Sequence, residues 1–118
     1  MNETDLKPRT KQFALRVIRL VEALPRGRTA DVIGRQLLRS ATSVGANYRA
    51  ACRARSPAEF RAKMGIVEEE GDESIYWIEL LVESNLVAAE RVTELLTEGN
   101  ELVAMTVASI RTSRRNEK

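Results

Sequence analysis

The strongest helix signal in the sequence lies in residues 56–81, SPAEFRAKMGIVEEEGDESIYWIELL. It opens with a capping box, in which Ser56 is the N-cap, Pro57 takes the first helical position and Glu59 stands three residues after the cap. Apolar and small residues then recur at steps of four and three, the spacing of a helix face that packs as in a coiled coil: Phe60, Met64, Val67, Gly71, Ser74, Ile78 and Leu81. The stretch therefore predicts a long helix over about 57–84.

The N-terminal half of the sequence contains two further segments with helical periodicity. Apolar residues indicate a helix over about 9–24, preceded by Pro8 and ended by the breaker at 25–27. A second helix is expected over about 30–54, with Thr29 as its N-cap. Its Gly34 and Gly45 are unfavourable for helix formation, and glycines in a helix that remains periodic usually allow a neighbouring backbone to come close.

The C-terminal part predicts a last helix over about 88–112, followed by a frayed tail at 113–118. Four helices of this length with short connections predict a single domain spanning 1–118, an all-α antiparallel up-down four-helix bundle. The composition agrees, because aromatic residues make up only 4% and clusters typical of β-strands are few.

The residue types present exclude several functions. The chain has no histidine, which removes histidine-activated nucleophiles and histidine metal ligands, and its one cysteine, Cys52, cannot form an intrachain disulfide. The acids at 68–73 do not lie on the packing seam, so we expect no bound metal, no cofactor and no catalytic residue. The protein is therefore predicted not to be an enzyme.

No targeting or membrane segment is visible in the sequence. The N-terminus lacks a basic start followed by an apolar run, and the longest uncharged stretches, 40–48 and 102–110, are far shorter than the roughly 20 residues of a spanning helix. These features predict a cytoplasmic protein without a membrane partner.

Charge is divided unevenly along the chain. Residues 1–63 hold 14 Lys and Arg against 5 Asp and Glu, which is +9, whereas residues 64–118 hold 5 against 12, which is −7. Such a division indicates either a basic surface for nucleic acid or attraction between the two halves, within one chain or between copies.

The helix expected over 30–54 carries an arginine row on the side opposite its apolar residues. The row and its continuation past the next turn form a candidate nucleic-acid surface: Arg35, Arg39, Arg49, Arg53, Arg55, Arg61 and Lys63. Arginine forms two parallel hydrogen bonds to phosphate and stacks on bases, which favours a nucleic-acid partner. Contact with a protein partner and an inert, solvated helix face remain alternatives.

The helix expected over 57–84 is apolar nearly all round, more than one bundle core can cover. Its outer side is predicted to form an interface between copies of the chain: Ile66, Tyr76, Trp77 and Leu80. The alternative is irregular packing that places Trp77 inside the bundle.

A polar set lies between the two predicted surfaces. Side chains on one flank of the second helix and acids of the third are expected to pair in the same or a neighbouring chain: Gln36, Arg39, Ser43, Asn47, Glu69 and Glu73.

The run QLLRSATSVGAN at residues 36–47 resembles the signature of four-helix-bundle proteins related to the 23S ribosomal-RNA intervening-sequence protein. Further residues are similar to those of the family in type and spacing: the pairs at 59–60 and 69–70 and the run at 76–81. The resemblance covers about residues 8–113. It implies an antiparallel bundle assembled into a homopentameric ring. One branch of the family is the accessory protein of diversity-generating retroelements, which binds nucleic acid and the reverse transcriptase. Residues 48–52, YRAAC, depart from the Glu-Gly that follows the Asn in many members.

These features lead to one functional hypothesis and one alternative. The first is a non-catalytic homo-oligomer, with a pentamer favoured by the resemblance, that binds RNA or DNA through its arginine face. The alternative is an interaction or accessory module whose arginine row contacts a protein, such as a reverse transcriptase, or a neighbouring subunit.

Overall fold

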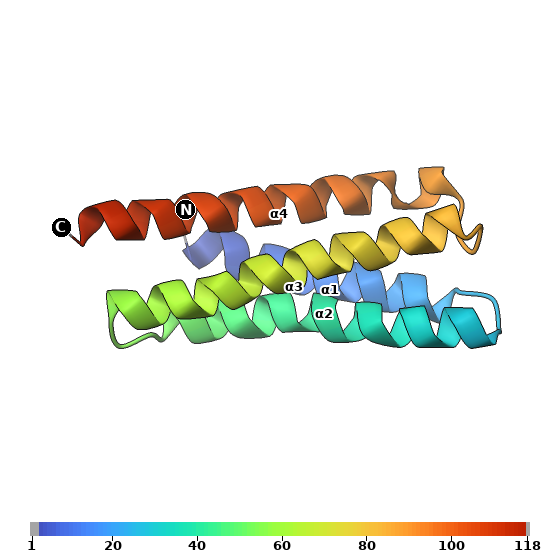
Figure 1. Ribbon diagram of the computed structural model, residues 1–118, viewed down its shortest axis with the longest axis horizontal. Helices are drawn as coiled ribbons and strands as arrows, with labels where there is room; N and C mark the ends of the chain where they lie inside the picture. The colour runs from blue at the N-terminus through green and yellow to red at the C-terminus, as the bar shows by residue number, and fades with distance from the viewer. Residues whose placement is uncertain (1–2, 118) are drawn as a thin grey trace.

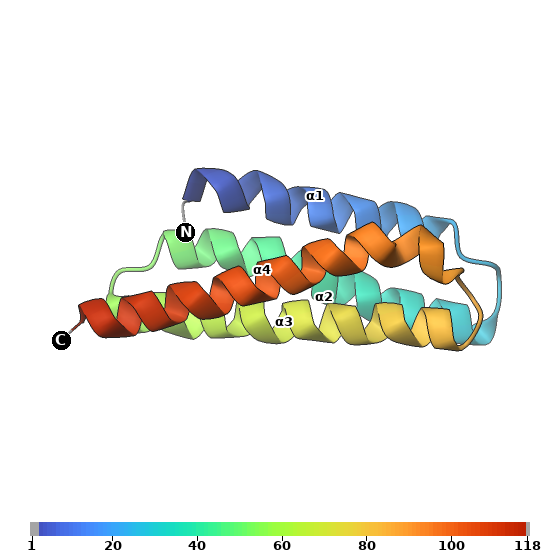
Figure 2. The same cartoon turned by 90° about the horizontal axis from the view of Figure 1, so that it is seen from above.

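The computed structural model describes residues 3–117, and the side chains of these from Leu6 onward. This part of the chain forms four α-helices and no strand: α1 (Glu3–Glu22), α2 (Arg28–Cys52), α3 (Pro57–Glu83) and α4 (Ala89–Asn116). The helices lie side by side in an elongated bundle of 51 × 21 × 20 Å, and the connections lie at alternating ends (Figures 1 and 2). The predicted all-α class is confirmed.

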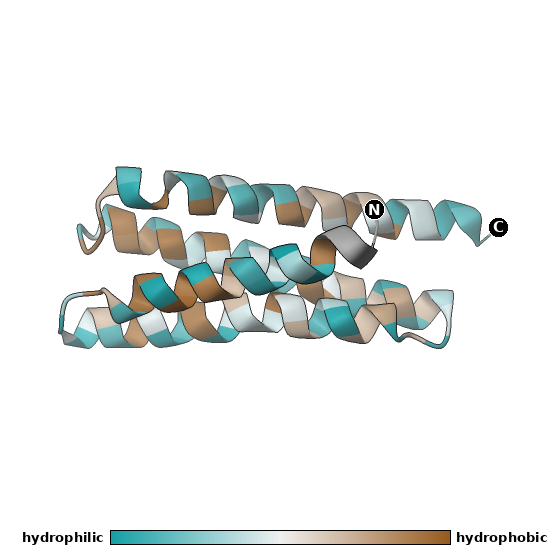
Figure 3. Ribbon diagram, turned by 180° about the vertical axis from the view of Figure 1, so that it is seen from behind, coloured by the Kyte–Doolittle hydropathy of each residue, from teal (hydrophilic) through white to brown (hydrophobic). Residues whose placement is uncertain are grey.

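The bundle core is built from the apolar face of every helix. Brown and teal segments alternate along the helices in Figure 3, as expected for amphipathic helices. The fully buried side chains include Phe13 and Val17 of α1, Leu37 and Val44 of α2, and Met64 of α3. Of the neighbouring helix pairs, α1 and α4 contact each other least, and Figure 2 shows α1 diverging from α4 toward the N-terminus of α1.

The first helix begins earlier than the predicted residue 9. It runs through Pro8, although proline donates no backbone hydrogen bond. Leu6, on the turn before Pro8, is buried, and the hydroxyl of buried Thr10 donates to the Leu6 carbonyl at 2.8 Å. Burial of Leu6 therefore holds the helix on both sides of the proline.

The ends of α2 also differ from the prediction. Thr29 is not the N-cap, because Gly27 occupies that position and the backbone N–H of Asp31 donates to the Gly27 carbonyl at 3.0 Å. The helix ends at Cys52 instead of the predicted residue 54. Its last turn is tighter than an α-helical turn, because the Arg53 N–H donates to the Ala50 carbonyl, three residues earlier, at 3.1 Å.

The start of α3 follows the predicted capping box. The Ser56 hydroxyl oxygen accepts from the Glu59 N–H at 3.0 Å, and the Glu59 carboxylate accepts from the Arg55 N–H at 3.0 Å. The helix ends at Glu83, and Asn85 then adopts a positive φ of 64° in the turn to α4.

Residues 113–116, predicted as part of a frayed tail over 113–118, are helical, and Lys118 lies outside the described residues. The helix α4 continues to Asn116, because its last turns are fixed by contacts with α3. Arg61 donates to the Ser113 hydroxyl oxygen at 3.3 Å and forms an ion pair with Glu117. These partners lie more than fifty residues apart in the sequence, beyond the reach of a local pattern.

Candidate nucleic-acid interface

Most of the predicted arginine row lies on the outer side of α2. Arg35, Arg49 and Arg53 are exposed, and Arg55 follows them in the exposed connection to α3. The opposite side of the helix is buried in the core, at residues such as Leu37 and Val44. None of the four guanidinium groups has an acidic partner among residues 6–117. Their charge is therefore open to a ligand.

Arg39 belongs to the same row but is already engaged. Its guanidinium donates to the Glu70 carboxylate at 2.9 Å and forms a second ion pair with Glu73, which connects α2 to α3. The hydrogen bond to Glu73, together with the field of Glu70, raises the pKa of Arg39. Gln36 accepts a longer hydrogen bond of 3.5 Å from the same guanidinium.

The predicted polar set forms only in part. Glu70 takes the place expected for Glu69, which is exposed and has no salt bridge in the described chain. Ser43 donates to the Arg39 carbonyl at 2.7 Å, and Asn47 donates to the Ser43 carbonyl at 2.9 Å, so both bond to their own helix. Glu70 and Glu69 stand three and four residues before Glu73, so helical spacing places either beside it, and the packing of α2 on α3 selects Glu70.

The last two residues of the predicted surface belong to the start of α3. Arg61 is only 17% exposed and is held by Ser113 and Glu117, and Lys63 is half-buried. Arg61 is therefore less available to a ligand than the prediction required.

The structure adds arginines that the sequence prediction did not include in this surface. The start of α3 and the ends of α2 and α4 meet at one end of the bundle (Figure 1). Exposed Arg111, Arg114 and Arg115 of α4 lie at the same end of the bundle as Arg53 and Arg55, on other sides of α4 than the one that Ser109 and Ser113 occupy. We call these five arginines, together with Arg61 and Lys63, the basic end.

The predicted interface on α3 is partly exposed. Tyr76 is 53% exposed and Ile66 is 37% exposed, whereas Leu80 is half-buried and packs against the core. Trp77 is also half-buried, with its ring centroid 5.1 Å from that of Tyr76, and its buried Nε1 has no hydrogen-bond partner in the described chain. Tyr76 and Ile66 are thus the interface candidates that face solvent.

The described residues contain neither a candidate metal site nor a candidate membrane-spanning helix. They contain no group of three or more cysteine, aspartate or glutamate side chains placed to hold a metal ion. None of their helices combines the length and the apolar character that crossing a membrane requires.

The fold and its surfaces define a small four-helix-bundle protein with a basic face on α2. A model of the 23S rRNA-intervening sequence protein family matches residues 2–108, and the chain belongs to that family. A crystal structure of a protein of unknown function from the S23 ribosomal protein family, from Bacteroides thetaiotaomicron, is 33% identical, with a TM-score of 0.83. The match covers 88% of this chain and 96% of the other. No curated protein matches the sequence.

Proposed function

We propose that this protein is a non-catalytic, homo-oligomeric bundle of the cytoplasm that binds RNA or DNA through the basic face of α2. The observation that carries the proposal is the set of exposed arginines that have no acidic partner among residues 6–117: Arg35, Arg49 and Arg53. The family description, which refers to an intervening sequence of 23S rRNA, supports a nucleic acid as the ligand.

The chemistry of the arginine face suits a phosphate backbone. From Arg35 to Arg53 the row extends about 27 Å at 1.5 Å per residue. Guanidinium groups spaced along it can each donate two hydrogen bonds to a phosphate. Such contacts are largely independent of base sequence, so we expect weak, mostly non-specific binding that decreases steeply with salt.

Assembly would strengthen this binding. Exposed Tyr76 and Ile66 on α3 are proposed to contact a second copy of the chain, and the family resemblance favours a pentamer. Several copies would present several arginine rows to one nucleic acid, which increases avidity without any new kind of contact.

The test measures binding to labelled duplex RNA and duplex DNA by fluorescence anisotropy, at a series of salt concentrations. The triple variant Arg35→Ala, Arg49→Ala, Arg53→Ala removes the row. The matched control Lys11→Ala, Arg19→Ala, Arg26→Ala removes the same charge from exposed positions on α1 and the turn after it. We expect the first variant to bind more weakly, with a log–log salt slope lower by about 0.9 per lost phosphate contact, and the control to bind nearly as the wild type does.

Two results would contradict the proposal. Equal weakening by both triple variants would mean that only net charge matters. No binding by the wild-type protein at low salt would favour the alternative, in which the row serves a protein partner, such as a reverse transcriptase, or a neighbouring subunit.

A further inference from the structure

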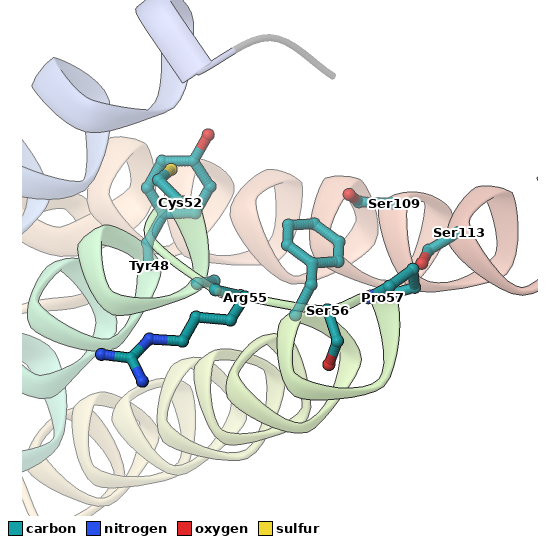
Figure 4. A pocket seen from close by; sticks show the side chains of 10 residues that line it. Tyr48, Cys52, Arg55, Ser56, Pro57, Ser109 and Ser113 are labelled. Atoms are coloured by element: carbon teal, nitrogen blue, oxygen red, sulfur yellow. The ribbon is translucent and has the colours of Figure 1, made fainter.

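A pocket of about 540 Å³ opens at the basic end, between the last turn of α2, the α2–α3 connection and the C-terminal part of α4 (Figure 4). Part of its wall is apolar: Ala51, Ala54, Pro57 and Phe60. The other lining residues are polar or carry a heteroatom: Tyr48, Cys52, Arg55, Ser56, Ser109 and Ser113. Its volume lies within the range of about 300–1,000 Å³ that is usual for small-ligand sites.

The pocket is open because of how the helices end. In Figure 2, α4 extends well beyond the start of α1 at this end of the bundle. Among the residues whose side chains the structure describes, none of α1 lines the pocket, and that part of α1 does not cover the apolar wall that includes half-buried Phe60. The pocket could therefore receive a flat apolar group.

The α4 side of the pocket offers hydrogen-bonding groups. Ser109 and Ser113 lie one helical turn apart on this wall (Figure 4). The Ser113 hydroxyl oxygen accepts from Arg61 at 3.3 Å. The half-buried Ser109 hydroxyl has no hydrogen-bond partner in the described part of the chain, so it is free to donate to a ligand or accept from one.

The end of the bundle that holds the pocket is strongly basic, and Arg55 lines the pocket itself. The seven residues of the basic end carry positive charge, and the acids between residues 49 and 63 and from 109 to 117 are only Glu59 and Glu117. Glu117 is already paired with Arg61. A ligand that combines a flat ring, hydrogen-bonding edges and negative charge fits these features together.

We propose that the pocket takes the base of an unpaired nucleotide, whose phosphates lie on the arginines of the basic end. The inference rests on the proposed function and adds that single-stranded segments are preferred. In a duplex the bases are stacked and paired and cannot enter, whereas a base in a single strand can turn out and stack on a side chain such as Phe60.

The experiment compares two probes by fluorescence anisotropy, a ten-nucleotide oligouridylate and a blunt RNA duplex of ten base pairs. Ser109→Leu narrows the pocket and removes the free hydroxyl, Ser109→Ala removes only the free hydroxyl, and Ala108→Leu adds a similar bulk at the neighbouring exposed position. We expect Ser109→Leu to weaken oligouridylate binding about tenfold, the order of one base stack, with duplex binding unchanged. Ser109→Ala should have a smaller effect in the same direction, and Ala108→Leu none.

Cys52 supplies an independent measurement, because it lines the pocket and is the chain's only cysteine. Saturating oligouridylate should slow its reaction with a maleimide several-fold in the wild-type protein, and the duplex should not.

The outcomes separate the pocket from the arginine face. Unchanged oligouridylate affinity in folded Ser109→Leu, or no protection of Cys52, would overturn the pocket while the salt-dependent binding of the proposed function remained. Loss of all nucleic-acid binding in the wild-type protein would overturn both.

Discussion

Two serine hydroxyls join α2 to α3 inside the bundle. Ser40 and Ser74 are both 0% exposed, and the Ser74 hydroxyl donates to the Ser40 oxygen at 2.9 Å. The Ser40 hydroxyl also lies 3.2 Å from the Leu37 carbonyl oxygen, so its own proton has an acceptor. Small side chains that satisfy each other allow the two helices to pack closely without a buried unbonded polar atom.

Replacing one of these serines should destabilise the fold measurably. Ser74→Ala loses the hydrogen bond between the helices and should lower the free energy of unfolding by about 1 kcal/mol. Ser74→Val also overfills the site and should cost about 1–3 kcal/mol. Urea denaturation checks both values, with the exposed Thr97→Val as a control expected within about 0.5 kcal/mol of wild type. A Ser74→Val protein as stable as wild type would show that this contact is not close-packed.

At the scale of the helices, the glycines differ in what surrounds them. A Cβ atom on Gly45 of α2 would lie 3.2 Å from the Thr10 hydroxyl oxygen and 3.6 Å from the Thr10 backbone carbon, so this glycine permits the predicted close approach of α1. Gly65 of α3 has no neighbouring atom within 4 Å of such a Cβ. The first is required by packing, whereas the second only weakens its helix.

Alanine at these two positions should therefore have different effects. Gly65→Ala should raise the free energy of unfolding by about 0.5–1 kcal/mol, because alanine favours the helix and nothing is displaced. Gly45→Ala should show none of this gain and should be the less stable variant, because buried Thr10 cannot move aside without disturbing its bond to Leu6. Thermal unfolding of the two single variants checks the order, and equal stabilisation would contradict it.

At the scale of the whole molecule, the opposite charges of the two halves meet within one chain. Arg9 of α1 donates to the Glu98 carboxylate of α4 at 2.9 Å, a hydrogen bond that raises the pKa of Arg9, and Arg39 pairs with acids of α3. Arg16 lies 4.0 Å from Glu94. The remaining arginines of α2 have no such partners among the described residues, and exposed Tyr76 on α3 belongs to the surface proposed for assembly.

The oligomeric state should depend on Tyr76. We expect the wild-type protein to form a discrete oligomer. Tyr76→Glu should shift it toward smaller species, because the glutamate carboxylate would be buried in the apolar contact proposed between copies of the chain. Light scattering at micromolar concentration measures the shift. Ala104→Glu, at an exposed position on α4, is the matched control and should leave the oligomer intact.

The single tryptophan gives a second measurement of assembly. Trp77 is next to Tyr76, so its emission should move to longer wavelength as the oligomer dissociates and water reaches the ring. A monomeric wild-type protein would contradict the proposed assembly.

The sequence by itself determined the features that depend on neighbours within one or two helical turns. The apolar spacing along each helix indicated all four of them, and the Ser56 capping box placed the start of α3 correctly. Such signals can be read locally because their partners lie three or four residues apart.

Only the tertiary structure decided the features that join distant residues. Burial of Leu6 keeps α1 helical on both sides of Pro8. The contacts of Arg61 with Ser113 and Glu117 keep the end of α4 helical. The same packing engages Arg39 with Glu70 and gathers the ends of three helices into the basic end and its pocket. Helical periodicity fixes the direction in which a side chain points from the axis of its helix. Which residues that side chain contacts depends on how the neighbouring helices are rotated and offset. The packing of the whole bundle sets this rotation and offset.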